Sequence, residues 1–153
     1  MGIDLSLIWF VIIVFATLMY IVMDGFDLGI GILFPATHNG DDRDVMVNSV
    51  APVWDGNETW LVLGGAALFG AFPLAYAVII DALTIPLTLM LIGLIFRGVA
   101  FEFRFKATPA HRPFWDKAFI GGSILATVTQ GVTVGAVING FSVTGRAYSG
   151  GPF

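Results

Sequence analysis

The chain has 153 residues, of which 57% are hydrophobic and only 12% are charged, and its net charge is −4. Charged residues make up about 25% of an ordinary soluble domain, so this composition excludes that class and indicates an integral membrane protein. The absence of cysteine excludes disulfides and thiolate metal sites. The sequence has no basic patch of the kind that binds nucleic acid, so nothing in it suggests DNA or RNA as a partner.

The first apolar segment carries no charge from Leu5 to Met23, which is long enough to cross a hydrocarbon core of about 30 Å. It lacks the basic start and the small-residue cleavage site of a removable signal peptide, so we expect it to be retained. It continues into MDGFDLGIGILFP. We place the first span at residues 5–33 and expect a loop over residues 35–51, which are polar and rich in turn residues.

The next long apolar stretch covers residues 59–96 and is interrupted only by Asp81. As one helix it would be about 60 Å long, which is twice the thickness of the hydrocarbon core. We therefore expect it to fold back at Pro73, with spans at residues 52–72 and 77–101. Asp81 is then an interfacial acid near the start of the third span.

Two further prolines give local predictions. Asn48 and Ser49 precede Pro52, an order typical of a helix that starts with a cap and an early proline. Pro86 lies inside the third expected span, so it should kink that helix.

The fourth expected span covers residues 116–140 and is rich in small residues and threonine, which suit close packing between membrane helices. The connection before it, residues 104–115, lies in the most basic part of the chain, whereas the turn near Pro73 holds no basic residue. The positive-inside rule therefore places residues 104–115 and 35–51 in the cytoplasm. The basic residues that set this orientation are Arg104, Lys106, Arg112 and Lys117.

These elements predict an all-α fold, an integral membrane four-helix bundle formed by residues 1–153 as one unit. The tail GRAYSGGPF has the composition of a loop that leads to another span. We therefore expect the chain to be the first half of a larger multi-span subunit.

Asp55 and Glu58 open the second expected span within APVWDGNETW and share one helix face, because they are three residues apart. Acids in the first turn of a helix also interact favourably with its dipole, which is the structural alternative. The neighbouring Trp54 and Asn57 make this an unusually polar and aromatic helix start. We favour a proton-conducting mouth at Asp55 and Glu58, supplied from cytoplasmic water.

Asp24 and Asp27 lie one turn apart at the end of the first uncharged run, where interfacial placement is the alternative to a functional role. Arg97 follows fifteen uncharged residues, and an unpaired cation inside a membrane is costly. We expect Arg97 to form a buried ion pair with one of the acids, the alternative being a side chain that extends to the interface. These groups would all lie toward the cytoplasmic half of the membrane.

Both histidines, His38 and His111, lie in expected loops. A transmembrane b-type haem needs axial ligands such as His or Met that project into a bundle. The spans offer Met19, Met23 and Met90, which are typical packing residues. We expect this chain to bind no haem and no metal by itself and to hold no catalytic residue.

Three segments in register resemble subunit II of cytochrome bd-type quinol oxidases, including the cyanide-insensitive branch. They are MDGFDLGIGILFP, APVWDGNETWLVLGGAALFGAFP and FRGVAFEFR. GRAYSGGPF also resembles the loop after the fourth span of that family, so the resemblance covers the whole chain. The family fold is two four-helix bundles and a peripheral helix, of which a chain of this length would be the first bundle.

The resemblance implies an enzyme of the bacterial inner membrane that oxidises quinol and reduces oxygen to water, with proton uptake from the cytoplasm. It implies a heterodimer with subunit I, and subunit I holds haem b and haem d. A small accessory subunit can also belong to this complex. It also implies contact with lipid and a structural quinone in subunit II. Asp55 matches the aspartate of the WDG motif, which the family associates with a proton route.

Two other classes fit the residues alone. Intramembrane acids and proline-broken helices are also found in ion-coupled transporters, although the acids here gather on one side and no inverted repeat is visible. The third interpretation is a structural scaffold for a larger membrane partner.

Overall fold

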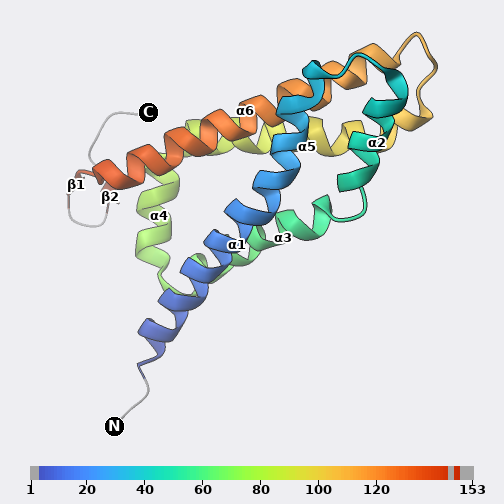
Figure 1. The fold of residues 1–153 in the computed structure, drawn as a ribbon. Helices are drawn as coiled ribbons and strands as arrows, with labels where there is room; N and C mark the ends of the chain where they lie inside the picture. The colour runs from blue at the N-terminus through green and yellow to red at the C-terminus, as the bar shows by residue number, and fades with distance from the viewer. Residues whose placement is uncertain (1–3, 145–146, 149–153) are drawn as a thin grey trace.

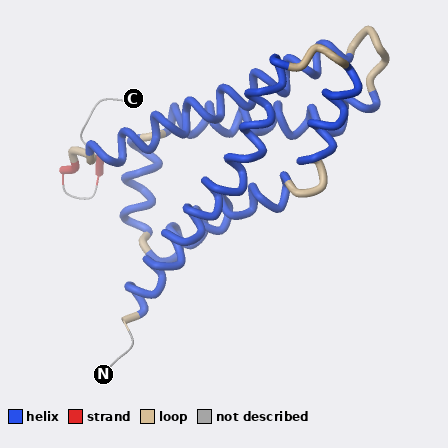
Figure 2. Tube along the Cα trace, viewed as in Figure 1, coloured by secondary structure: helices blue, strands red, loops and turns tan. Residues whose placement is uncertain are grey.

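The computed structural model describes residues 4–144 and 147–148, and this part of the chain is almost wholly helical (Figure 2). An all-α membrane fold is therefore confirmed. The strands, β1 (Val143–Thr144) and β2 (Ala147–Tyr148), form one short antiparallel pair. The helices are α1 (Leu5–Leu33), the 3-10 turn η1 (Phe34–Ala36), α2 (Gly40–Val50), α3 (Trp54–Ala71), α4 (Pro73–Ala82), α5 (Thr84–Lys106) and α6 (Arg112–Asn139).

The four longest helices form two packed pairs (Figure 1). Helix α1 lies beside α3, α5 lies beside α6, and α1 also contacts α6. Helix α4 crosses between the pairs at one end of the molecule, while α2 and the α5–α6 connection lie together at the other end.

The α5–α6 pair packs closely because two glycines face each other across it. A Cβ atom added at Gly93 would lie 2.8 Å from the carbonyl oxygen of Gly122, closer than real Cβ contacts come. Small residues of this kind let membrane helices approach each other. The buried core of Phe34, Val47, Ala100, Phe101 and Phe119 lies near the α2 end of this pair.

The expected loop over residues 35–51 is instead largely helical. The Asn39 side chain accepts a hydrogen bond from the backbone N–H of Asp41, which caps the start of α2. Acids in the first turn then favour the helix dipole. Asn48 and Ser49 lie inside α2, so the prediction that they cap the following helix is wrong; α3 begins after Val53 without a side-chain cap.

The break expected at Pro73 is confirmed, since α3 ends at Ala71 and Pro73 begins a new helix. The segment expected to form the third span, residues 77–101, is divided between two helices, α4 and α5, with a break at Leu83. Pro86 lies in the first turn of α5 and does not kink a helix interior. Because Pro86 has no backbone N–H, it cannot donate the hydrogen bond that would continue α4. In the first turn of a helix a backbone N–H has no partner within the helix, so proline is tolerated at the start of α5.

Three helices in the described part of the chain are long and apolar enough to cross a membrane: Leu5–Ala36, Thr84–Lys106 and Arg112–Asn139. Helix α3 lies where we expected the second span, but it has only 18 residues and is not among these three. Four spans and their orientation therefore stay predictions. Most of the tail GRAYSGGPF lies outside the described residues.

Candidate functional site

Arg97 of α5 is completely buried and faces three carboxylates from two other helices. Its Nη1 lies 3.0 Å from Asp24 Oδ1 of α1 and 2.8 Å from Glu58 Oε1 of α3, and its Nη2 lies 3.6 Å from Asp27 Oδ2 of α1. The buried ion pair that the sequence predicts for Arg97 is therefore present.

Asn57 joins the same group of side chains. Its Nδ2 donates a 2.8 Å hydrogen bond to Asp27 Oδ2, and the residue is almost fully buried. We call Asp24, Asp27, Asn57, Glu58 and Arg97 the Arg97 cluster. It connects α1, α3 and α5.

The Arg97 cluster holds three carboxylates and one guanidinium, so Arg97 alone cannot neutralise it when all the acids are ionised. Asp24 and Asp27 are completely buried, whereas the Glu58 side chain is 21% exposed. Within residues 4–144, Asp27 Oδ1 has no hydrogen-bond partner, whereas the Asp24 carboxyl also interacts with the hydroxyl group of Tyr20 on α1. Buried polar atoms are normally hydrogen-bonded, so the free oxygen of Asp27 is a position for a proton or a water molecule.

Trp54 covers one side of the Arg97 cluster. Its ring stacks on Phe101 of α5 at 5.1 Å and lies close to Gly98, where a Cβ atom would be 3.1 Å away. The Arg97 guanidinium lies 5.5 Å from the centre of the same Phe101 ring. Packing against Phe101 and Gly98 therefore fixes the position of Trp54. Among the described residues, its contacts are with these apolar groups and not with the Arg97 guanidinium.

Asp55 and Glu58 line the same groove of about 540 Å³ but have different environments. Asp55 is exposed in the first turn of α3, whereas Glu58 reaches from the groove to Arg97. The groove also contains Glu102, which sequence reasoning missed although it lies in the FRGVAFEFR segment, five residues after Arg97.

A second charged group connects α2 to the ends of α5 and α6. Arg104 is buried and pairs with Asp44 of α2 and, at 2.6 Å, with Asp116 of α6. Arg43 lies 2.9 Å from the same Asp116. The sequence analysis counted Arg104 only as an orientation signal, because nothing local to it indicates partners 12 and 60 residues away.

His38 lies between η1 and α2, and His111 immediately precedes α6, so neither lies within a helix. In the described residues no group of three or more His, Cys, Asp or Glu side chains is arranged to hold a metal ion.

The fold and the Arg97 cluster define a helical membrane protein with a charged centre between its helices. The family model for cytochrome bd terminal oxidase subunit II matches residues 5–153, so the chain belongs to this family. It is a multi-pass protein of the bacterial inner membrane.

Curated relatives agree. The chain is 36% identical to the probable cytochrome oxidase subunit 2 of Haemophilus influenzae over 138 residues, which are 89% of this chain and 36% of that protein. The identity and both shares are the same for the cytochrome bd-I ubiquinol oxidase subunit 2 of Escherichia coli. This chain is also 34% identical to the cytochrome bd ubiquinol oxidase subunit 2 of Bacillus subtilis over 140 residues, which are 89% of this chain and 41% of that protein. The chain thus spans well under half the length of these relatives.

Proposed function

We propose that this chain works as part of subunit II of a bd-type quinol oxidase, which oxidises quinol and reduces oxygen to water. The family implies that haem b and haem d bind to a partner, subunit I, and the position of both histidines of this chain outside its helices supports this. A small accessory subunit and a structural quinone belong to the same proposal, and the described contacts assign neither of them to a place on this chain.

Within that enzyme, the Arg97 cluster carries protons that oxygen reduction consumes. Asp55 is exposed and exchanges protons with cytoplasmic water, and Glu58 lies one turn further along α3 on the same groove. A carboxyl group that is partly exposed and partly enclosed is suited to accept a proton on one side and release it on the other. The contact of Glu58 with buried Arg97, at 2.8 Å, is the observation that supports this role.

The two buried aspartates, Asp24 and Asp27, are further carboxylates that can accept a proton on this route. Arg97 holds one formal positive charge against three carboxylates, so a proton that arrives at Glu58 reduces the excess negative charge of the cluster. Asn57 fixes one oxygen of Asp27 and leaves the other available.

The test is oxygen consumption by the complete oxidase with Asp55→Asn or Glu58→Gln. Both variants should lower quinol-dependent oxygen uptake by about 10²-fold or more, the range expected when a positioned acid–base group is lost. The reduced-minus-oxidised haem spectrum should stay unchanged. Asp42→Asn, an equally small change at an exposed acid of α2, is the matched control and should leave uptake unchanged.

Two outcomes would contradict the proposal. If both variants lose haem or fail to assemble, the cluster is a structural anchor, which is the scaffold interpretation. If the purified chain carries no haem-bearing partner and moves a solute across vesicle membranes, the transporter interpretation is correct.

A further inference from the structure

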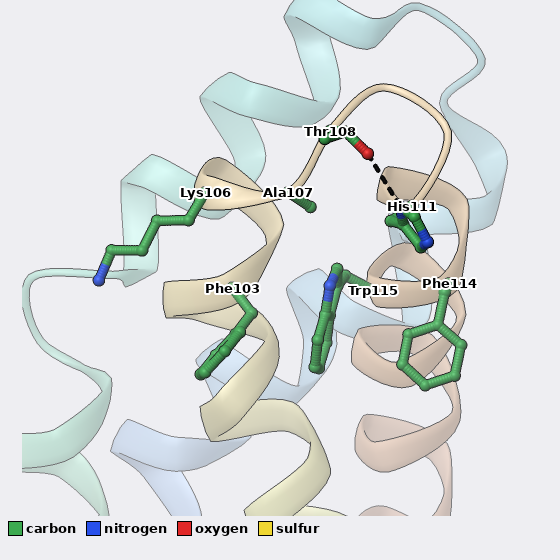
Figure 3. Close-up of a pocket in the computed structure, with 7 residues that line it drawn as sticks. All are labelled: Phe103, Lys106, Ala107, Thr108, His111, Phe114 and Trp115. Atoms are coloured by element: carbon green, nitrogen blue, oxygen red, sulfur yellow. Dashed lines mark hydrogen bonds between the residues drawn. The ribbon is translucent and has the colours of Figure 1, made fainter.

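An aromatic hollow of about 620 Å³ lies under the connection between α5 and α6 (Figure 3). Its residue Phe103 also lines the groove of Asp55 and Glu58. Three rings form its wall: Trp115 lies between Phe103, at 5.1 Å, and Phe114, at 5.0 Å. Lys106, Thr108 and His111 form its rim, and no carboxylate lines it. We call these six residues the aromatic hollow.

The hollow is open toward the surroundings of the protein. Phe103 and Phe114 are 52% and 58% exposed, although both are large apolar side chains. In Figure 3 the three rings lie below the connecting loop, while His111 and Thr108 lie in the loop above them. Thr108 and His111 hold each other through a 2.8 Å hydrogen bond across the loop. An apolar floor and a polar rim at a helix end fit a site at the boundary between membrane and water.

The positive charge of Lys106 on the rim favours an anionic ligand. Among the residues that the structure describes, the ion pair of Lys106 is with Glu102 on its own helix, and both side chains are largely exposed, 73% and 68%. Exposed pairs of this kind contribute little and are readily exchanged for another anion. The buried Arg104 nearby is already matched by Asp44 and Asp116. In Figure 3 the exposed Lys106 side chain extends away from the three rings, so an anion would pair with it at the outer edge of the hollow.

We propose that the aromatic hollow binds one acidic phospholipid, with the phosphate near Lys106 and His111 and an acyl chain against the three rings. Basic residues at the cytoplasmic ends of membrane helices attract anionic head groups. An aromatic wall directly below them accepts the apolar part of the same molecule. This binding site borders the groove of the proposed proton route at Phe103, but its proposed role does not depend on that route.

The test uses the full-length chain with any co-purifying partner, reconstituted in nanodiscs that contain either brominated phosphatidylglycerol or brominated phosphatidylcholine. Bromine on an acyl chain quenches nearby tryptophan fluorescence. The signal of Trp115 is obtained as the difference between the wild type and Trp115→Phe. We expect Trp115 to be quenched at a severalfold lower content of phosphatidylglycerol than of phosphatidylcholine.

Substitution of the rim separates a specific site from a general lipid contact. Lys106→Gln with His111→Ala should raise the phosphatidylglycerol content needed for half quenching by about fivefold or more, the effect of one cation at an anionic surface. Lys117→Gln, an exposed lysine of α6 outside the hollow, is the control and should have little effect.

The proposal is overturned if both lipids quench Trp115 equally, or if the rim variant keeps the wild-type preference. It is also overturned if neither lipid reaches Trp115, because a protein partner then covers the hollow. Because both substituted residues are exposed, the variant should keep its wild-type melting temperature.

Discussion

At the scale of single residues, Arg97 decides how the charges of α1 and α3 are held. A guanidinium stays protonated in proteins, so its burial requires anionic partners. Asp24, Asp27 and Glu58 supply them, and the two fully buried aspartates in turn need Arg97. The dependence is mutual, which makes the loss of the cation more harmful than the loss of one acid.

Arg97→Met should therefore destabilise the protein by about 3–5 kcal/mol, the cost of leaving a buried charge unpaired. Thermal unfolding of the purified protein measures this. Arg112→Met is the matched control, because Arg112 is 40% exposed and lies 3.6 Å from Asp44. An exposed pair contributes at most about 1 kcal/mol. Similar melting temperatures for the two variants would show that Arg97 is not held as described.

The sequence indicates part of this site and not the rest. Fifteen uncharged residues before Arg97 are enough to predict a buried ion pair, because an unpaired cation is costly there. The choice of partners is not local: Asp24 is 73 residues away and Glu58 is 39 residues away. Asp55 and Glu58 look equivalent by spacing, and only the approach of α5 makes one a contact of Arg97 and leaves the other exposed.

At the scale of elements, the α5–α6 pair requires one of two neighbouring glycines of α6 and not the other. A Cβ atom added at Gly122 would lie 2.9 Å from the backbone nitrogen of Arg97, whereas one at Gly121 would meet nothing within 4 Å. The first glycine is required by the close approach of α5, and the second is not.

Gly122→Ala should therefore lower stability by about 1–3 kcal/mol through overpacking. Gly121→Ala should be neutral or should stabilise the helix by about 0.5–1 kcal/mol, because glycine is unfavourable in a helix interior. Melting temperatures of the two variants give the comparison. A stabilised Gly122→Ala protein would contradict the close packing of α5 on α6.

Helix α2 shows why the elements could be predicted only in part. Apolar length identifies α1 and α6, because a membrane helix needs about 20 apolar residues. Helix α2 is polar and buries only Val47 and Val50, so apolar periodicity does not reveal it. The Asn39 cap and the acids after it are the signal that could have done so. The α4–α5 break follows from Pro86, which we interpreted as a kink rather than as a helix start.

At the scale of the whole molecule, the structure brings both expected cytoplasmic segments to one end. Helix α2 and the α5–α6 connection are joined by Arg104 with Asp44 and Asp116, and the α3–α4 turn lies at the opposite end (Figure 1). This arrangement agrees with an orientation in which the basic connection faces the cytoplasm.

The lack of cysteine makes the orientation directly measurable. Single cysteines at Asp42 and Ala110 should react with a membrane-impermeant maleimide only after the inner membrane is opened. A cysteine at Leu74, near the α3–α4 turn, should react in intact spheroplasts. Labelling of the unfolded proteins controls for reactivity. The reverse pattern would invert the orientation and remove cytoplasmic proton supply to Asp55.

The contact between Asp24 and Arg97 also has a consequence for biosynthesis. Ribosomes add about 5–20 residues per second, so the 73 residues between these two side chains take about 4–15 s to be made. During that interval α1 has left the ribosome while its two aspartates still lack their cation. Because unpaired acids are costly inside a membrane, we expect the nascent first helix to stay in the translocon or at the membrane surface until α5 arrives.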